Sequence, residues 1–418
     1  MPKRGDISLE RNGADLLTPE EIGRYNEMIC RTLGDRARLY DVDGLYRPVA
    51  RRELMEWIAR ETTERRPAFC GRAAVTEEDW TRWEQNRALD ALPHELLPRR
   101  GVCVCRGSLR ALPTAEHVTA QPDDRYDDLL QLTAVLPNEP LVVFCASADG
   151  RYYFAAAYFH MGWIAAEEVG LCGAADWSAA RSEGFLRVTG SAVTLCADPY
   201  EPRASERRFP MGTRLPLAAP PETVRVLRHR MSYDCYCVLV PARGTDGRLE
   251  WVEALVPCSA DVSVGDLPYT DGAAAELAQK MRGEVYGWGG LLDGRDCSAL
   301  VGDVYRCFGF RLPRNSGDLA RLPHGVSLEG LTDGEKRKRL RAIPAGAILY
   351  FPGHVMLWLG GEGGCPRCLS AAGNFLPEGS AGGVPRAVNT VTVTSLDVVR
   401  ANGRTWLASL TRAVWPRL

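Results

Sequence analysis

The sequence changes its character twice along 418 residues, and these changes limit the folds that the chain can adopt. Helix-forming stretches dominate residues 1–99, short strand-forming runs dominate residues 100–264, and helix-forming stretches return from residue 265. One hydrophobic core seldom serves a chain of this length. We therefore predict a multidomain protein.

The first segment carries clear signals for helices. Thr18-Pro-Glu-Glu has the N-cap residue, the proline and the acidic first turn that begin many helices. Apolar residues follow at helical spacing, namely Ile22, Tyr25, Ile29 and Leu33. Two more helical runs cover residues 52–65 and 77–91. We expect residues 1–99 to form a helical N-terminal domain.

The middle of the chain has the texture of small β-barrels. Short β-rich runs alternate with glycine turn signals, and no long helical pattern separates them. The phrase Asp149-Gly-Arg-Tyr-Tyr-Phe, followed by Gly162-Trp-Ile, resembles a bacterial SH3 domain. Leu249-Glu-Trp-Val-Glu is a weaker counterpart further along. The length suits two barrels, so we expect SH3-like domains at residues 100–190 and 191–264.

Composition and charge argue against several classes of function. The formal net charge is -2, so no overall field attracts nucleic acid. The longest apolar stretches, such as Pro140 to Ala146, are too short to span a bilayer. The N-terminus shows no signal peptide. A basic run from Lys336 to Arg341 is expected to form a solvated helix face, with contact to acidic peptides as the alternative.

Cysteine is abundant, with fourteen residues in the chain. Most are expected to be small buried hydrophobic residues. Cys365-Pro-Arg-Cys368 differs, because CxxC spacing suits a disulfide, a redox pair or half of a zinc site. No second pair of suitable spacing completes a tetrahedral ligand set. We therefore expect no metal and no cofactor, and the role of Cys365 and Cys368 stays open.

One cysteine stands at a predicted helix start. Glycines at positions 287, 289, 290 and 294 allow tight turns before Asp296, which is a good N-cap residue. Apolar residues continue at helical spacing, namely Leu300, Val301, Val304 and Tyr305. Cys297 is therefore expected in the first helical turn, where the helix dipole and free N–H groups favour a thiolate. The same N–H groups can donate to a developing oxyanion.

A histidine opens a predicted strand further along the chain. Two apolar strands flank Pro352-Gly353, and His354 begins the second of them. A histidine at a strand start can face a helix that carries a nucleophile, and cysteine activated by such a base is the general form of thiol catalysis. A cysteine helix followed by a histidine strand is the order of a papain-like α+β domain. Cys297 and His354 are the expected nucleophile and base.

Several motifs, in order, resemble the NlpC/p60 family of bacterial cell-wall cysteine peptidases. They are Tyr286-x-Trp-Gly-Gly, Asp296-Cys297-Ser298, Leu312-Pro-Arg314-x-Ser316, Pro344-x-Gly346, and Gly353-His-Val355 with Leu357 and Gly360. The resemblance implies a papain-like catalytic domain at residues 265–418. The upstream layout is similar to that of multidomain members that cut murein stem peptides between D-glutamate and a diamino acid. It implies a γ-D-glutamyl-L-diamino acid endopeptidase that favours stems with a free N-terminal L-alanine.

The resemblance also implies roles in substrate binding. Asp296 would bind the ammonium group of the substrate, since a carboxylate is the natural partner of a primary amine. Tyr286 and Ser298 would line the same pocket. His160 lies where the first SH3 domain of the relatives approaches the site, so it is a further candidate.

The sequence departs from the family pattern at the third catalytic position. The family usually has a second histidine on the strand after the base, whereas this chain has no histidine after His354. Alignment places Ser370 at that position. Asn374 has the same parity and would face the same side of a regular strand, and asparagine has precedent in papain-like enzymes. The choice between Ser370 and Asn374 stays open.

Two other classes of function compete with a peptidase. The missing histidine and the accessory barrels suggest a catalytically weak wall-binding protein. A papain-like fold can also pass its thioester to an acceptor other than water, as an acyltransferase. In each case we expect murein stem peptides to be the partner, either in intact murein or after release. We expect the protein to be a monomer. We expect a cell-envelope protein whose leader is absent from this sequence, with the cytoplasm as the alternative.

Overall fold

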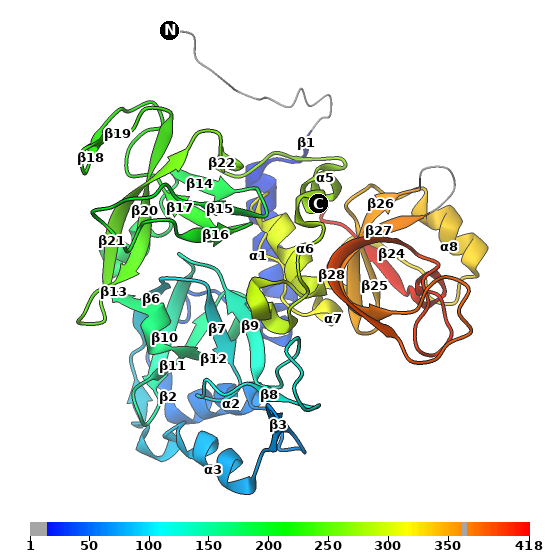
Figure 1. The fold of residues 1–418 in the computed structure, drawn as a ribbon, viewed down its shortest axis with the longest axis horizontal. Coiled ribbons are helices and arrows are strands. Elements are labelled where there is room, and N and C mark those ends of the chain that lie inside the picture. Colours follow the sequence, from blue (N-terminus) through cyan, green and yellow to red (C-terminus); the bar gives the residue numbers. More distant parts are fainter. Residues whose placement is uncertain (1–14, 362–365) are drawn as a thin grey trace.

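The computed structural model describes residues 15–361 and 366–418. Three lobes are visible in Figure 1: two β-rich lobes stacked at one side and a helix-and-sheet lobe beside them. The chain enters the lower β lobe first, continues into the upper one, and ends in the lobe on the right. The predicted multidomain organisation is confirmed. In the described part of the chain, no helix is long and apolar enough to cross a membrane.

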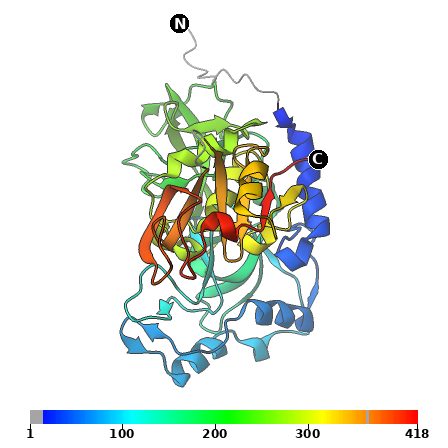
Figure 2. The same ribbon diagram turned by 90° about the vertical axis from the view of Figure 1, so that its right-hand side faces the viewer.

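The first helix, α1 (Pro19–Thr32), packs against the C-terminal lobe. It begins with the predicted cap, because Thr18 and Glu21 exchange side-chain and backbone hydrogen bonds. Its apolar face, including Ile29, is buried in the same hydrophobic core as residues of the C-terminal lobe. Tyr25 packs edge-to-face on Phe310, with ring centroids 5.7 Å apart. Figure 2 shows α1 running along the flank of this lobe.

The other N-terminal helices belong to the first β lobe. Helix α2 (Arg51–Glu61) shares a core with Phe154 and Trp163 of that lobe. Helix α3 (Glu77–Gln85) packs its two tryptophans, Trp80 and Trp83, in another core of the same lobe. Among the described residues before position 99, none forms a hydrophobic core separate from those of the later lobes. The helical segment is therefore divided between two lobes.

The first β lobe is built on a seven-stranded antiparallel sheet. Its order is β13-β6-β10-β11-β12-β7-β9, with bounds β6 (Arg99–Cys103), β7 (Gly107–Arg110), β9 (Gln131–Val135), β10 (Pro140–Ala146), β11 (Tyr152–Ala157), β12 (His160–Ala165) and β13 (Val169–Cys172). The two phrases that resemble a bacterial SH3 domain form the β11–β12 hairpin, in which Phe154 lies opposite Trp163.

The second β lobe follows after helix α4 (Ala174–Ala179) and has a core of its own. Its strands are β14 (Phe185–Val188), β15 (Ala192–Thr194), β16 (Arg208–Pro210), β17 (Arg214–Pro216), β18 (Val226–Leu227), β19 (Arg230–Met231), β20 (Cys235–Arg243), β21 (Leu249–Pro257) and β22 (Val262–Val264). The longest pair, β20 and β21, supplies Val238, Val240, Val252 and Val256 to that core. Its assignment as an SH3-like barrel stays a prediction.

The C-terminal lobe places helices before its sheet, as the α+β order predicts. The helices are α5 (Ala273–Ala278), α6 (Cys297–Arg306), α7 (Ser316–Leu319), α8 (Asp333–Leu340) and α9 (Trp406–Ser409), with the short 3-10 helices η4 (Gln279–Met281) and η5 (Trp288–Asp293). The six-stranded sheet has the order β24-β29-β25-β26-β27-β28, with bounds β24 (Gly325–Ser327), β25 (Ile348–Phe351), β26 (His354–Gly360), β27 (Arg367–Phe375), β28 (Arg386–Ser395) and β29 (Arg412–Val414).

Strand alternation gives this sheet two buried faces. On β26, Val355 and Leu357 face the core that includes α6. Met356 and Trp358 face a second core that includes Trp406 of α9. The period-2 pattern therefore decides which of the two cores each strand residue can reach.

Short elements complete the fold. They are β1 (Asp15–Leu17) paired with β23 (Tyr269–Thr270), β2 (Val49–Ala50) paired with β5 (Glu95–Leu96), and a small sheet of β4 (Ala73–Ala74), β3 (Phe69–Cys70) and β8 (Val118–Thr119), with the 3-10 helices η1 (Gly34–Ala37), η2 (Leu89–Ala91) and η3 (Ala166–Glu168).

The basic run and the CxxC pair are two further features that the sequence singled out. The basic run forms α8, but Lys336 is 3% exposed and its ammonium donates to the carbonyls of Ala408 and Leu410. The expectation of a solvated face is wrong for this lysine, because the carbonyls at the end of α9 need a donor. Cys365 lies outside the described residues, and Cys368 is buried on β27 with its thiol 3.4 Å from the hydroxyl of Thr394.

Candidate active site

The predicted nucleophile begins α6. Asp296 is the N-cap, and its carboxylate accepts a hydrogen bond from the N–H of Ala299 at 2.9 Å. The preceding chain turns sharply at Gly289 and Gly290, both with positive φ, and the N–H of Gly289 donates to Asp296 at 2.9 Å. The expectation that Cys297 sits in the first turn of a helix is confirmed.

The thiol of Cys297 is protonated at neutral pH. Burial raises its pKa to about 11, and the neighbouring carboxylate of Asp296 adds to that increase. The N–H of Val355 and the guanidinium of Arg314 act in the opposite direction but do not cancel it. Cys297 therefore needs a base to become a thiolate.

The predicted base, His354, opens β26 as expected. Its ring is half-buried and packs on Phe351 and Trp406, with centroids 5.4 Å and 5.0 Å away. Burial lowers the pKa of His354 to about 4, and the nearby charge of Arg400 acts in the same direction. The imidazole is therefore neutral at pH 7, which is the form that can accept a proton.

The structure brings together the two segments that carry the predicted nucleophile and base, but it does not join the two side chains. The thiol of Cys297 faces the N–H of Val355, the residue next to His354. The imidazole packs on Trp406, in the core on the other face of the sheet, and its Nε2 has no hydrogen-bond partner among residues 15–361 and 366–418. Catalytic hydrogen bonds often form only when substrate binds.

The two candidates for the third position differ sharply in their surroundings. Ser370 is fully buried, and its hydroxyl has no hydrogen-bond partner in the part of the chain that the structure describes. Its strand neighbours Leu369 and Ala371 face the core of α6, so Ser370 faces the opposite core, the one that His354 contacts. Two buried polar atoms without partners thus lie on the same face of adjacent strands.

Asn374 does not share this environment. The pairing of β27 with β28 shifts by one residue between Ala372 and Asn374, and Asn374 is exposed. The expectation that it faces the same side as Ser370 assumed a regular strand, whereas Phe375, the residue after Asn374, packs on Trp406 in the core that Ser370 faces. The catalytic role of either residue stays a prediction.

The carboxylate of Asp296 is fully engaged. Besides its two N–H donors, it pairs with the guanidinium of Arg314, which donates to it at 3.1 Å, and accepts the hydroxyl of Ser298 at 3.2 Å. Arg314 also donates to Ser298 at 2.7 Å. These contacts keep the pKa of Asp296 below its ordinary value in spite of burial. A substrate ammonium would have to share this carboxylate with Arg314.

A second carboxylate near the site belongs to the first β lobe. Asp127 is partly buried, and no ion pair neutralises it in the described structure. Burial raises its pKa, and its charge in turn raises the pKa of Tyr286, together with burial and the charges of Asp296 and Cys297. The ring of Tyr286 lies beside Gly373 on β27. Asp127 and Tyr286 therefore belong to the surroundings of the nucleophile.

His160 is not brought to the catalytic pair by any contact of the described residues. It is 4% exposed, and its Nδ1 lies 2.7 Å from the carbonyl of Met161 and 3.7 Å from the carboxylate of Glu61. Burial lowers its pKa to about 3. These contacts explain His160 as a buried residue at the start of β12 that packs against the end of α2, and its role towards substrate stays a prediction.

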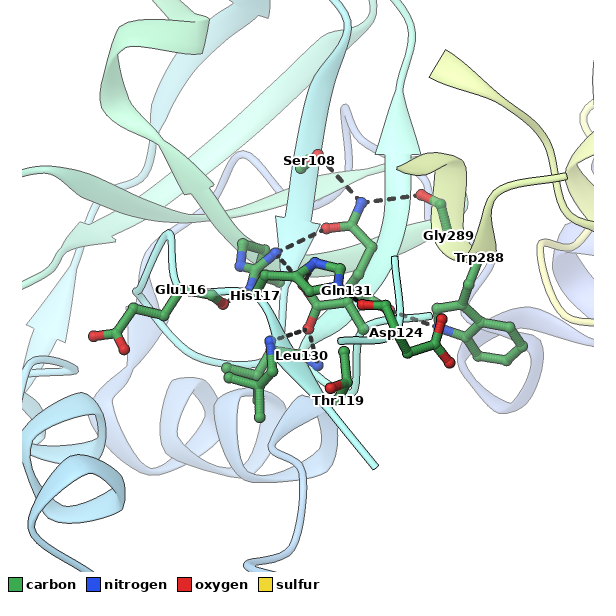
Figure 3. A network of polar contacts seen from close by, with 12 residues as sticks. Ser108, Glu116, His117, Thr119, Asp124, Leu130, Gln131, Trp288 and Gly289 are labelled. Atoms are coloured by element: carbon green, nitrogen blue, oxygen red, sulfur yellow. Dashed lines mark hydrogen bonds and ion pairs between the residues drawn. The ribbon is translucent and has the colours of Figure 1, made fainter. Parts of the chain in front are cut away.

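The first β lobe holds the glycine turn that precedes the nucleophile (Figure 3). The amide of Gln131 donates to the carbonyl of Gly289 at 3.0 Å, and the indole of Trp288 donates to the backbone carbonyl of Gln131 at 3.1 Å. The other end of the Gln131 amide accepts from Arg110, which is paired with the buried Asp128. A continuous set of polar contacts thus leads from the lobe to the N-cap of α6.

Two arginines make further contacts between the first β lobe and the C-terminal lobe. Arg106 donates to the carbonyls of Gly290 and Gly294, the latter at 2.7 Å. Arg314 donates to the hydroxyl of Thr133 at 2.7 Å while it pairs with Asp296. The β lobe therefore fixes both the glycine turn and the arginine that neutralises the N-cap carboxylate.

Several of these residues carry no signal in the sequence for a role at the site. Arg314 was visible only as part of a motif, and the pairing of an arginine with the N-cap of another element has no local signal. Asp127, Gln131 and Arg106 come from a different lobe, so only the tertiary structure brings them to the site. Trp406 lies far along the chain from His354 and had no signal either.

Comparisons with known proteins agree with the fold and with the resemblance to the NlpC/p60 family. The NlpC/P60 family model matches residues 283–374, and the model of the SH3 domain of SH3b1 type matches residues 119–165. A solved NlpC/P60 endopeptidase from Photobacterium damselae subsp. piscicida is 15% identical, with a TM-score of 0.74 over 98% of this chain and 95% of its own. An NlpC/P60 family protein from Bacillus cereus ATCC 10987 is 16% identical, with a TM-score of 0.50 over 76% of this chain and 99% of its own. No curated protein matches.

Proposed function

We propose that this chain, as a cysteine peptidase of the NlpC/P60 family with an SH3b domain, hydrolyses peptidoglycan peptides. The bond that it hydrolyses is the one between D-glutamate and the diamino acid of a murein stem peptide. The observation that carries the proposal is the position of Cys297 at the start of α6, with its thiol against the N–H next to His354.

In the first step, the sulfur of Cys297 attacks the γ-carbonyl of D-glutamate. The thiol proton passes to the neutral imidazole of His354 as the C–S bond forms. The N–H groups of the first turn of α6 stabilise the oxyanion. The imidazolium then gives its proton to the departing amine of the diamino acid, and the C–N bond breaks. Water, activated by the same imidazole, hydrolyses the thioester and restores the thiol.

Ser370 holds the imidazole during these steps. Its hydroxyl, directly or through one water molecule, is the partner of His354 Nε2. Two observations support this role: both atoms are buried without another partner, and both lie on the same face of β26 and β27. Asn374 is the weaker choice, because it is exposed beyond the strand irregularity.

The free amine of the stem binds at the wall that the first β lobe supplies. Asp127 is the main partner of this ammonium, because its carboxylate is partly buried and unpaired, whereas Asp296 is already neutralised by Arg314. Tyr286 and Ser298 line the same space. We therefore expect stems whose L-alanine has a free amine to be preferred over intact murein.

The experiment is an incubation of the full chain with L-Ala-γ-D-Glu-diaminopimelate. We expect release of L-Ala-D-Glu by the wild type and none by Cys297→Ala, and we expect Asp127→Asn to raise KM about tenfold. Asp123→Asn, a change of the same kind on the same loop at a residue that pairs with Arg72, is the matched control. Full activity in Cys297→Ala would contradict the proposal.

The same assay separates the two alternatives. A catalytically weak wall-binding protein would release no product from any stem while still binding it. An acyltransferase would transfer the L-Ala-D-Glu group to an added amine in preference to water. The peptidase proposal predicts hydrolysis as the main outcome, even when an added amine is present.

A further inference from the structure

A large cavity lies away from the catalytic pair. It measures about 770 Å³, within the range of sites for small organic ligands. Its walls come from α1, from the segment that follows η1, from the turn between β11 and β12, from the chain before α5, and from the chain after α6. Phe308, Gly309 and Arg311 line it just after α6 ends, whereas Cys297 begins that helix, so α6 separates the two by about 15 Å.

The floor of this cavity is apolar. Ile22, Leu39, Tyr269 and Phe308 line it, and each is less than one-tenth exposed. The helix side is also shaped by Gly23, where an added Cβ would meet nothing within 4 Å. An apolar body of moderate size can therefore occupy the cavity without displacing the backbone.

Two opposite charges at its rim are unpaired. Asp41 and Arg311 both line the cavity, and neither forms an ion pair within the described residues. The other charged residues at the rim are neutralised, because Glu27 pairs with Arg31 and Asp266 pairs with Arg187. The thiol of Cys30, also in the wall, has its pKa raised by burial and by Asp41 and lowered by Arg311, so both charges act on the same space.

We propose that this cavity is a binding site for a short peptide with a free ammonium group and a free carboxylate. Asp41 receives the ammonium, Arg311 receives the carboxylate, and the apolar side chains of the peptide lie on the floor that Ile22, Leu39 and Phe308 form. This site is separate from the catalytic one, so its failure would leave the proposed peptidase activity untouched.

The test is a calorimetric titration of the full chain with the tripeptide L-Ala-L-Leu-L-Ala, which has no γ-D-glutamyl bond. We expect one saturable site. Acetylation of the amine or amidation of the carboxyl group should weaken binding at least tenfold, and so should Asp41→Asn and Arg311→Gln. Gly23→Leu should abolish binding by filling the cavity, while Gly23→Ala, which adds one methyl group in open space, should keep it. Hydrolysis of L-Ala-γ-D-Glu-diaminopimelate should not change in these variants.

Three outcomes would overturn the proposal. The first is no binding of the tripeptide to the wild type. The second is binding that survives Gly23→Leu and is lost in Asp127→Asn, which would place the peptide at the catalytic site. The third is equal affinity for the free and the doubly blocked tripeptide, which would make the occupant a neutral apolar ligand.

Discussion

Burial acts in opposite directions on the two side chains that we assign to catalysis. It raises the pKa of Cys297 to about 11 and lowers the pKa of His354 to about 4. Both groups are therefore neutral at pH 7. The thiolate forms only as the imidazole takes its proton, and substrate must bring the two side chains into contact.

The first prediction at this scale concerns activity against pH. We expect kcat/KM to be nearly constant from about pH 6 to 8 and to fall as the pH decreases through about 4, where protonation removes the base. A pH–rate profile of the wild type measures this. An acid limb near pH 6.5, the ordinary value of histidine, would contradict the burial of His354.

The same shift affects stability. The unfolded state holds a proton on His354 below about pH 6.5, whereas the folded state holds one only below about 4. The contribution of His354 to stability is therefore present above pH 6.5 and is lost as the pH falls from 6.5 to about 4. We expect the unfolding temperature to decrease from pH 6.5 to 4, and to decrease less in His354→Gln. Equal slopes for both proteins would show that His354 is not the cause.

Ser370 gives a prediction that separates an orienting role from packing. Ser370→Ala should lower kcat about tenfold, equivalent to about 1.4 kcal/mol, with little change in KM. Ser370→Thr keeps the hydroxyl and should recover part of the loss. Asn374→Ala should behave like the wild type. If the asparagine variant loses activity and Ser370→Ala does not, the two assignments must be exchanged.

At the scale of elements, local signals were readable from the sequence and interruptions of a regular pattern were not. Thr18 and Asp296 are N-caps as expected, because capping depends on a few adjacent residues. The parity argument for Asn374 was wrong, because the pairing of β27 with β28 takes up one extra residue of β28 between Ala372 and Asn374. The sequence alone therefore left the choice between Ser370 and Asn374 open, and the catalytic role of either stays a prediction.

The glycine turn before α6 is the element that couples the β lobe to the nucleophile. Gly289 has a φ of 56°, and an added Cβ would lie 2.7 Å from the Cγ of Gln131. Gly289→Ala should therefore disturb the N-cap of Cys297 and reduce kcat at least a hundredfold. Gly283→Ala is the matched control, because its φ is also positive but open space surrounds it.

We expect that control to lose about 1 kcal/mol of unfolding free energy from backbone strain and to keep its activity. Enzyme kinetics and denaturant unfolding of both variants measure the two effects. Equal kcat values for the two would contradict the coupling.

At the scale of the whole molecule, the lobes share their hydrophobic cores. Ile29 of α1 is fully buried with residues of α6 and of the catalytic sheet, and α2 and α3 complete the first β lobe. The sequence reveals where helices and strands occur, but helical periodicity does not say which distant surface a helix covers. The contacts of Gln131 and Arg106 with the site, and the influence of the Asp127 charge on Tyr286, were hidden for the same reason.

Core sharing makes a prediction for α1. Ile29→Ala should reduce the free energy of unfolding by about 2–4 kcal/mol. The denaturant concentration at which the C-terminal lobe unfolds should decrease, and no separate helical domain should unfold. Arg24→Ala on the exposed side of α1 should change it by less than about 0.5 kcal/mol. Denaturant unfolding, followed together with the reactivity of the Cys297 thiol, measures both. Unchanged thiol reactivity as α1 unfolds would contradict the shared core.

The most direct test of the account is the detection of the acyl-enzyme. The full chain is mixed with L-Ala-γ-D-Glu-diaminopimelate, quenched in acid during turnover, and digested for mass spectrometry. We predict a thioester-linked L-Ala-D-Glu group on the peptide that contains Cys297, absent from Cys297→Ala. Product release without this adduct, or an adduct on another of the fourteen cysteines, would contradict the assignment of Cys297 as the nucleophile.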